Sequence, residues 1–358
     1  MNATFPSTPT TSSATQAGYQ WHDMPKALLH EHLDGGLRPQ TLLDLCRARN
    51  IAVPADNAAD LAAWMLANAD SGSLERYLQG FGLTVQAMAT EAGCEQVAFE
   101  AAEDARHDGC VLAEFRMAPL LLEPYGMAPE AVIEAILEGL HRSALDSGLI
   151  ICAMRTDSPQ ASVRAARLAA RYRDQGVVGF DLAGAEFGFP PRLHNEAYRL
   201  ARDAGLGLTC HAGEADVGSR VLEAASMGAT RIGHGVNIMR ADDPDVSAAW
   251  VDMARELGLH FEVCSTSNVH TGAAPSLAEH PIRRMLQAGL SVSCSTDNRL
   301  MSGVSVAEEL HRLYTHLDLP AHEAAQMMRH AAEASFLPAE ARARALAAMQ
   351  KWDASHPA

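Results

Sequence analysis

Four short stretches of the sequence combine imidazole and carboxylate side chains at spacings that suit metal binding and proton transfer. In the first, ALLHEHLDGGL, the residues His30, His32 and Asp34 alternate with other side chains. The second, HAGE, places Glu214 three residues after His211. The other two are IGHG, which contains His234, and STDN, which contains Asp297 and Asn298. Each stretch follows an apolar run, so polar groups gather where buried strands are expected to end.

These residue types are the ones that a catalytic zinc site uses. Such a site takes neutral imidazoles and a carboxylate and leaves one position for water. The side chains that can supply these ligands are His30, His32, His211 and Asp297. Bound zinc lowers the pKa of its water toward ~7, which makes hydroxide available at neutral pH. Glu214 is then free to act as an acid, and His234 can approach the water because it lies between two glycines.

Single parts of this pattern carry little weight. With 16 histidines in 358 residues, roughly one HxH pair is expected by chance from composition alone. A lone histidine after a strand is more often a core or surface residue, and a lone Asp297 would more often cap a helix or form a turn. The combination is more specific, because metal-binding residues cluster where a fold places its active site. The four stretches together therefore predict one site.

The sequence excludes two other arrangements of metal ligands. A plan with H-x-E and PCxxC needs a CxxC pair, and the seven cysteines contain none. A two-metal site bridged by a carbamylated lysine needs a lysine where the fourth strand ends. No lysine lies there, between Asp181 and Glu186, because the only lysines are Lys26 and Lys351. The prediction is one zinc per chain.

Eight short apolar runs alternate with helical patterns along the chain. Runs that are apolar throughout suit strands buried on both faces, as parallel strands are. The runs lie at 26–33, 110–119, 149–157, 177–186, 206–214, 229–236, 259–268 and 290–298. This alternation predicts an α/β fold, a (β/α)8 TIM barrel, with its active site at the carboxyl ends of the strands. Extra helices are expected between the first two strands and at the C-terminus.

One amphipathic segment lies in the long insertion after the first strand. In SLERYLQGF, four apolar side chains recur at the spacing of one helix face: Leu74, Tyr77, Leu78 and Phe81. The pattern alone leaves two interpretations open. The face packs on the barrel, as most apolar faces do, or it forms an apolar wall over the active site.

Composition limits the remaining options. The first 20 residues are rich in Ser, Thr and Ala and are expected to form a disordered tail before a single domain over residues 21–355. The net charge of −16 argues against nucleic acid as a partner, because an acidic surface repels phosphate backbones. No apolar run approaches the ~18 residues of a membrane span. Seven dispersed cysteines indicate free thiols in a reducing compartment, so a cytoplasmic location is expected.

Six motifs, in order and spacing, resemble those of the adenosine deaminases of the amidohydrolase superfamily: HEHLDGGL, FDLAGAE, HAGE, IGHG, CSTSN and STDN. The resemblance runs from about residue 24 to residue 335, and TDNRLMSG and SNVHTGA are most similar to bacterial members of the actinobacterial type. It implies zinc-dependent hydrolytic deamination of adenosine and 2′-deoxyadenosine, a reaction of purine salvage and catabolism on a small nucleoside.

The resemblance also implies a role for each matching residue. Glu214 would protonate N1 of the purine, and His234 would orient and deprotonate the zinc water. Gly184 would donate its backbone N–H to N3, and Asp34 would hold the ribose 5′-hydroxyl. The matching zinc ligands are His30, His32, His211 and Asp297, of which His32 also borders the substrate. The apolar helix over the nucleoside would be formed by Leu74, Tyr77, Leu78 and Phe81.

Three positions depart from the common pattern of the resembling family. Asn298 stands where many members have a second Asp, opposite the acceptor N7 of the purine. An amide donates at any pH, whereas a carboxyl group must first be protonated, so the contact is expected to persist. Ala185 replaces an Asp with little expected effect on catalysis. Thr156 follows MR where the family usually has His, so the pocket rim is expected to differ in detail there.

The sequence leaves two alternatives to adenosine deamination. A sister deaminase would act on adenine or on a modified aminopurine nucleoside. Asp34 favours a nucleoside, since adenine deaminases of this superfamily tend to carry Glu there, in HIEG. A catalytically inactive relative that only sequesters nucleoside would be expected to lack Glu214 or a metal ligand, and all of these are present.

Overall fold

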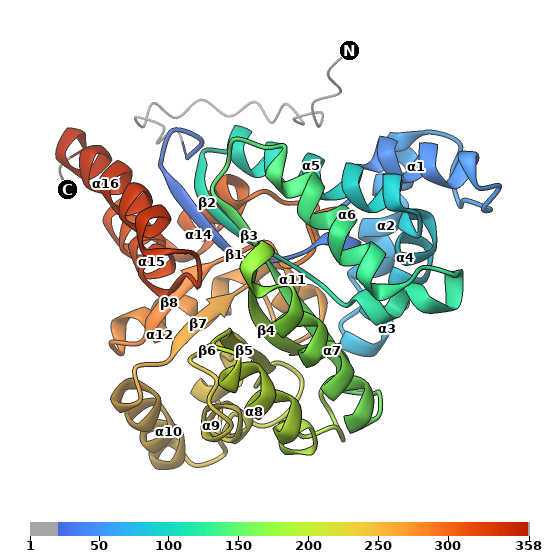
Figure 1. The fold of residues 1–358 in the computed structure, drawn as a ribbon. Coiled ribbons are helices and arrows are strands. Elements are labelled where there is room, and N and C mark those ends of the chain that lie inside the picture. Colours follow the sequence, from blue (N-terminus) through green and yellow to red (C-terminus); the bar gives the residue numbers. More distant parts are fainter. Residues whose placement is uncertain (1–20, 357–358) are drawn as a thin grey trace.

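The computed structural model describes residues 21–356, which form a barrel of strands surrounded by helices (Figure 1). The tail expected over residues 1–20 lies outside the described residues. Within residues 21–356, eight parallel strands follow one another around the sheet in chain order. The predicted (β/α)8 TIM barrel is therefore confirmed.

Each strand overlaps one of the eight apolar runs. The strands are β1 (Lys26–His32), β2 (Cys110–Met117), β3 (Ser147–Met154), β4 (Val177–Ala183), β5 (Gly207–Ala212), β6 (Arg231–His234), β7 (His260–Val263) and β8 (Ser291–Cys294). Most runs continue past the strand ends, because their last residues form the loops at the carboxyl end of the barrel. Those loops carry the polar groups of the four stretches.

The barrel closes through Asp297, which follows the end of β8. Its N–H donates to the carbonyl of His30 over 2.9 Å, and its carbonyl accepts from the N–H of His32 over 2.7 Å. These bonds form a parallel bridge to β1 at Glu31. Asp297 has a left-handed backbone with a φ of 61°, which is uncommon for residues other than glycine. Such conformations persist where the surroundings hold them, often at functional sites.

Helices cover the outside of the barrel. Between β1 and β2 lie η1 (Leu33–Gly35), α1 (Pro39–Ala48), α2 (Ala58–Ala69), α3 (Leu74–Leu78), α4 (Phe81–Met88) and α5 (Glu91–His107). Between β2 and β6 lie η2 (Pro119–Tyr125), α6 (Pro129–His141), α7 (Pro159–Arg171), η3 (Arg173–Gln175), η4 (Pro191–His194), α8 (Asn195–Asp203) and α9 (Ser219–Ser226). Between β6 and β8 lie η5 (Val236–Met239), α10 (Pro244–Glu256), α11 (Ser265–His270), η6 (Leu277–Glu279) and α12 (Ile282–Gln287).

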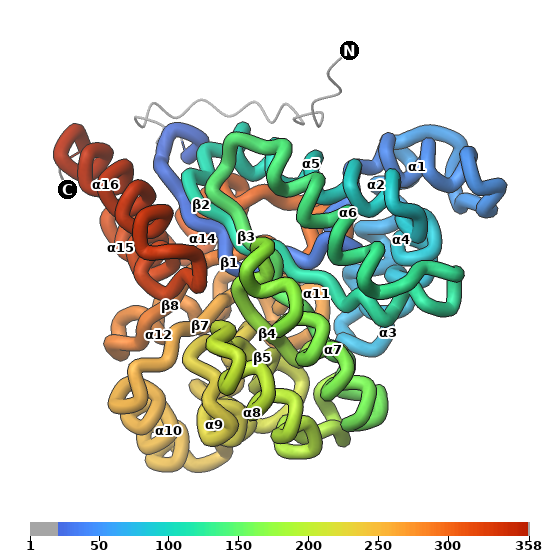
Figure 2. The backbone as a smooth tube through the Cα atoms, viewed as in Figure 1, coloured from blue at the N-terminus to red at the C-terminus, as the bar shows by residue number. Residues whose placement is uncertain are grey.

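The chain ends with helices that close the outer layer: α13 (Arg299–Ser302), α14 (Val306–Leu317), α15 (Ala321–Ala334) and α16 (Ala339–Ser355). Figure 2 shows α15 and α16 together on one side of the barrel, where α15 packs on β8 and β1 and α16 packs on β2. The expected extra helices are thus present after β1 and at the C-terminus. In the part of the chain that the structure describes, no helix has the length and apolar character needed to cross a membrane.

The helix expected over SLERYLQGF is interrupted. α3 ends at Leu78 and α4 begins at Phe81. Gln79 and Gly80 keep right-handed helical dihedrals, but their N–H groups bond to carbonyls three residues back. This tighter turn separates two α-helices where the sequence pattern predicted one continuous face. All four apolar side chains of the pattern nevertheless line one pocket.

The interior of the barrel beneath that pocket is charged. Arg116 on β2 and Arg231 on β6 are buried, and both donate to the carboxylate of Glu262 on β7. Arg116 also donates to Asp181 over 2.8 Å, and Arg231 donates to Glu114 over 2.6 Å. Buried charges are tolerated when they are paired in this way. The network joins β2, β4, β6 and β7 directly below the polar strand ends.

Candidate active site

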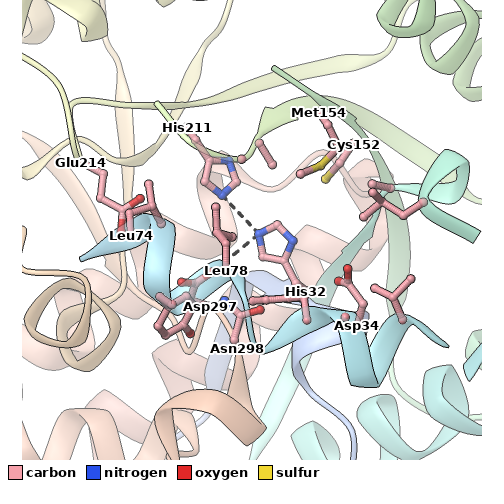
Figure 3. A pocket seen from close by; sticks show the side chains of 18 of the residues that line it. His32, Asp34, Leu74, Leu78, Cys152, Met154, His211, Glu214, Asp297 and Asn298 are labelled. Atoms are coloured by element: carbon pink, nitrogen blue, oxygen red, sulfur yellow. Dashed lines mark hydrogen bonds and ion pairs between the residues drawn. The ribbon is translucent and has the colours of Figure 1, made fainter. Parts of the chain in front are cut away.

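A pocket of about 380 Å³ opens at the carboxyl ends of the strands, the end predicted from the sequence. Its polar lining residues are His32, Asp34, His211, Glu214, His234, Asp297 and Asn298. Apolar side chains from α3, α4, η2 and the ends of β2, β3 and β4 form the other walls. Figure 3 shows His32 at the centre of this polar group, between His211 and Asp297. The pocket thus joins a polar end to an apolar chamber.

Five polar side chains lie close enough together to share one ion. The ligand atoms of four buried residues lie within 4.8 Å of one another, and these residues are His30, His211, His234 and Asp297. His32 joins them, because its Nε2 lies 3.2 Å from Nε2 of His211 and 3.6 Å from Oδ1 of Asp297. The structure therefore brings together all four residues predicted as ligands and adds His234 as a geometric candidate.

Two buried carboxylates orient two of these histidines. Nδ1 of His30 lies 2.9 Å from Glu262, and Nδ1 of His211 lies 3.0 Å from Asp181. A carboxylate only accepts, so each Nδ1 carries the proton and each Nε2 keeps its lone pair for the cluster. Burial alone would raise the pKa of both carboxyl groups, but facing cationic groups, Arg116 among them, hold each pKa well below its usual range. Both acceptors are therefore ionised.

The donor set fits a metal ion. Oδ2 of Asp297 accepts from the hydroxyl of Ser267 over 2.6 Å, while Oδ1 lies 3.3 Å from Nε2 of His30. That Nε2 atom is buried and has no hydrogen-bond partner within residues 21–356. An anionic oxygen and imidazole nitrogens with free lone pairs thus converge on one point, which is the ligand chemistry of catalytic zinc.

Glu214 lies beside this cluster in an environment that keeps it protonated. Burial raises the pKa of Glu214 to about 8, and the negative charges of Asp297 and Glu186 act in the same direction. The hydroxyl of Thr271 donates to Oε1 of Glu214 over 3.0 Å. A carboxyl group with a raised pKa can hold a proton at neutral pH and donate it, as a general acid must.

The loop that carries Glu214 is held by another carboxylate. Glu186, which follows β4, accepts hydrogen bonds over 2.6–3.1 Å from four consecutive backbone N–H groups, those of Gly213, Glu214, Ala215 and Asp216. Several N–H groups that donate to one carboxylate form strong, directional bonds. Glu186 therefore fixes the backbone from which the acid side chain projects.

His234 ends β6 with its two ring nitrogens in different surroundings. Nε2 lies 3.6 Å from Oε2 of Glu214, and Nδ1 lies 3.0 Å from Nδ2 of Asn268 on α11. A Cβ atom on Gly233 would lie only 3.0 Å from Cε1 of His30. Glycine at this position therefore allows β6 to bring His234 close to the histidines of the cluster.

The remaining predicted contact residues line the same pocket. Asp34 lies in η1 rather than on β1, but it still borders the cavity with His32. Gly184 has a φ of 95°, and Asn298 begins the turn into α13. The apolar wall is formed by Leu74, Tyr77, Leu78 and Phe81, so the segment from α3 to α4 lies over the pocket. Of the two interpretations of that segment, the geometry favours the wall over the site.

Several residues of the site were missed by the sequence reasoning. Asp181 and Glu262 bond the cluster histidines, and Glu186, Asn268 and Thr271 bond the catalytic candidates or their loop. A signal for the first two was present, since each is an acidic residue inside an apolar run, FDLA and FEVC. The departure at position 156 lies apart from the site, because Thr156 is exposed and is not among the residues that line the pocket.

Comparisons with known proteins agree with this geometry. The family model described as adenosine deaminase matches residues 25–352. An adenosine deaminase of Mycobacterium marinum is 42% identical over 305 residues, which is 81% of this chain and 84% of the relative. The structure of an adenine deaminase from Arthrobacter aurescens is 26% identical with a TM-score of 0.82, over 92% of this chain and 99% of that one.

A more distant solved structure has the same fold. It is an amidohydrolase from Burkholderia ambifaria with bound Zn, with 23% identity and a TM-score of 0.81. The match covers 94% of this chain and 92% of that chain.

Proposed function

Because this chain belongs to the adenosine deaminase family, we propose that it hydrolyses adenosine and 2′-deoxyadenosine to inosine and 2′-deoxyinosine, with release of ammonia. The observation that supports this most directly is the position of Glu214 and His234 beside a metal-type cluster at the polar end of one pocket. Addition of water to a purine ring needs an activated water and a proton for the ring nitrogen. An acid, an imidazole and a metal site at one point meet that need.

The donor set suits one zinc ion per chain, and the residues proposed to hold it are His30, His32, His211 and Asp297. Zinc, when bound, supplies Lewis acidity and makes water nucleophilic near neutral pH. Glu262 and Asp181 turn the lone pairs of two of these histidines toward the cluster, and Ser267 holds one oxygen of Asp297. Such supporting bonds fix the orientation of ligands and raise their basicity.

Glu214 is proposed to protonate N1 of the purine as water adds to C6. Its raised pKa keeps the proton available at neutral pH, and Thr271 and Glu186 hold its side chain and backbone. His234 is proposed to orient the attacking water, since its Nε2 faces Glu214 across 3.6 Å. Glu214 is proposed to regain a proton from the water, and the hydroxyl proton of the addition product moves to the amino group, so that ammonia leaves and inosine remains.

The other end of the pocket is proposed to bind the nucleoside. Oδ1 of Asp34 is buried and has no hydrogen-bond partner within residues 21–356, so it is available to the ribose 5′-hydroxyl. Gly184 and Asn298 are proposed to donate to N3 and N7 through a backbone N–H and an amide. The apolar wall from Leu74 to Phe81 is proposed to cover the base and sugar.

Charge in the pocket favours a nucleoside over a nucleotide. In the described part of the chain, no lysine or arginine lines the pocket, whereas Asp34, Glu214 and Asp297 do. A 5′-phosphate group would therefore lie beside Asp34 with no lysine or arginine of this lining to pair with it, which is unfavourable in a partly buried site. The alternative substrates are adenine and modified aminopurine nucleosides. Asp34 argues against free adenine, because its carboxyl group would then have no sugar hydroxyl to bond.

The proposal extends to partners and location. The net charge of −16 supports a small molecule rather than nucleic acid as the partner. All seven cysteines are free and buried, which supports a cytoplasmic location, where thiols stay reduced.

The proposed reaction is tested by product analysis. Zinc-loaded protein incubated with adenosine should yield inosine and ammonia in equal amounts, measured by chromatography and by an ammonia assay. Release of adenine or ribose instead would show cleavage of the glycosidic bond and would contradict deamination.

A further inference from the structure

A chain of hydrogen bonds runs from a backbone amide to the ring of His234. It starts at Ile282, whose N–H donates to Nδ1 of His280 over 3.2 Å. Nε2 of His280 lies 3.3 Å from Oδ1 of Asn268, and Nδ2 of Asn268 lies 3.0 Å from Nδ1 of His234. The three side chains are buried, so water does not replace these bonds. The chain links the loop after η6, helix α11 and the end of β6.

The first bond fixes the proton of His280. A backbone N–H can only donate, so Nδ1 of His280 must accept and cannot carry a proton. Burial, together with the charges of Arg240 and Arg284, lowers the pKa of His280 to about 3, so the ring is neutral. A neutral imidazole with a free Nδ1 carries its proton on Nε2. His280 therefore donates from Nε2.

The second bond fixes the amide of Asn268. Its oxygen must face Nε2–H of His280, because the NH2 group there would oppose another donor. Its NH2 group then faces Nδ1 of His234 and donates to it. A proton on Nδ1 of His234 would meet this donor, which excludes both the imidazolium and the tautomer protonated at Nδ1. The remaining form of His234 carries its proton on Nε2.

We propose that Asn268 and His280 are positioning residues that hold His234 as the neutral tautomer with its proton on Nε2, the nitrogen that faces Glu214. The inference rests on the proposed function and refines the role of His234 within it. An Nε2–H group can donate a hydrogen bond to the attacking oxygen, but it cannot accept a proton from it. The relay thus makes His234 a donor that orients the nucleophile, in place of the base that the resemblance implies.

The same relay separates His234 from the metal ligands. His30 and His211 donate from Nδ1 to the carboxylates of Glu262 and Asp181, which leaves Nε2 with a lone pair. His234 instead accepts at Nδ1 from an amide, so its Nε2 has a proton and no lone pair for an ion. Carboxylates thus fix one tautomer for His30 and His211, and an amide fixes the opposite tautomer for His234. The ligand atoms of these three histidines lie within 4.8 Å of one another.

The test is the ring nitrogen spectrum of His234 in the zinc-loaded protein. Long-range proton–nitrogen correlation NMR of protein labelled at histidine distinguishes protonated from unprotonated ring nitrogens. The signals of His234 are assigned by their loss in His234→Gln. The proposal expects an unprotonated Nδ1 and a protonated Nε2. A protonated Nδ1 in the natural protein would overturn it.

Asn268→Asp should reverse the tautomer of His234. Aspartate has nearly the same shape, but it only accepts, so Nδ1 of His234 should become protonated. We expect kcat for adenosine to fall at least ~10-fold, a modest part of what acid–base and donor groups contribute, with KM and zinc content within about 2-fold of the natural values. An unchanged His234 spectrum in this variant would contradict the relay.

His280 is tested with two variants and one control. His280→Gln keeps a donor for Asn268 and should keep both the spectrum and kcat, whereas His280→Leu removes the donor and should give a mixed spectrum and a lower kcat. The control is His260→Gln, which removes another buried histidine, whose ring nitrogens bond to the hydroxyls of Ser291 and Ser293, and should change neither.

Equal effects of the two His280 variants would mean that His280 only packs. If the natural protein has no activity on adenosine, the proposed function fails. The His234 spectrum then still decides whether the relay exists.

Discussion

A Cβ atom added to Gly35 would lie 1.9 Å from Oδ1 of Asn298. The loop after β1 and the loop after β8 therefore interlock, and only glycine at position 35 leaves room for the Asn298 side chain. Gly35 follows Asp34 directly. Its packing against Asn298 therefore places the proposed sugar-binding residue next to the proposed N7-binding residue. With its oxygen against Gly35, the amide of Asn298 has its nitrogen left to meet the purine.

Asn298→Ala should weaken discrimination at N7. In 7-deazaadenosine a C–H group replaces N7, and a site built to bond a substrate atom rejects an analogue that lacks it. We expect 7-deazaadenosine to be a poor substrate for the natural protein, and Asn298→Ala to lower kcat/KM for adenosine and largely remove the difference. The measurement is the ratio of kcat/KM for the two compounds in both proteins.

Asn298→Asp is the matched variant for that experiment. It should restore the contact only if the new carboxyl group takes up a proton, which burial beside Asp297 favours. If Asn298→Ala leaves the adenosine to 7-deazaadenosine ratio of kcat/KM unchanged, Asn298 does not contact N7. It is then a residue that supports Asp297.

Asp34→Ala should lower kcat/KM for adenosine far more than kcat/KM for adenine. The hydrogen bond between Asp34 and a buried sugar hydroxyl is worth ~1–3 kcal/mol. Adenine has no sugar, so it does not make this bond and loses nothing when Asp34 is replaced. Burial raises the pKa of Asp34 to about 7, so Asp34→Asn is the control that keeps the shape without the charge. Equal losses of kcat/KM on both substrates would show that Asp34 does not read the sugar and would favour the adenine alternative.

Much of this site could be predicted from the sequence, because its residues lie where strands end. His30, His32, His211 and Asp297 follow apolar runs, and the barrel brings strand ends together. The residues that bond and orient these ligands could not be predicted in the same way. Asp181 and Glu262 lie inside the runs, and their partners are 30 and 232 residues away in sequence.

The tautomer of His234 depends on a bond from the backbone N–H of Ile282, the first residue of α12, which no residue pattern encodes. The break between α3 and α4 was missed for a related reason. The helical spacing of Leu74 and Phe81 persists through the tighter turn at Gly80, so the pattern cannot show it.

Glu214→Gln should keep the binding of zinc and nucleoside but lower kcat at least ~10²-fold, because glutamine cannot donate an acidic proton and general acids contribute that much. Glu309→Gln is a matched control. Glu309 is also a buried carboxyl group, with its pKa raised by burial to about 7, but it does not line the pocket, so kcat should stay close to the natural value. Steady-state kinetics of both variants check this, and near-normal kcat in Glu214→Gln would remove Glu214 from the acid role.

The pH dependence should follow the proton of Glu214. Its pKa is raised, so the active acid form is present at low and neutral pH and is lost as the pH rises through the folded-state value, about 8; a bound cation lowers this value. The profile of kcat/KM should therefore fall on its alkaline side. Thr271→Val removes a donor that favours the carboxylate, so this fall should move to higher pH. A fall that stays in place or moves lower would contradict the assignment.

Removal of the metal should abolish activity. We expect elemental analysis of active protein to give one zinc per chain, and chelation followed by readdition of zinc to remove and restore turnover. Asp297→Ala should lose zinc, whereas Glu214→Gln should retain it and serve as the control. Two tightly held metals per chain, both needed for turnover, would contradict the single site.

A comparison of substrates tests most directly whether this pocket deaminates a nucleoside. The zinc-loaded natural protein is given adenosine, adenine, an N6-methylated adenosine and adenosine 5′-monophosphate, and the change in purine absorbance gives kcat/KM for each. We expect the highest value for adenosine, at least ~10-fold above adenine, because adenine lacks the buried sugar contact. We expect poor use of the monophosphate, because no cation in the described part of the pocket lining meets the phosphate. A higher kcat/KM for adenine or for the monophosphate than for adenosine would contradict the proposed function.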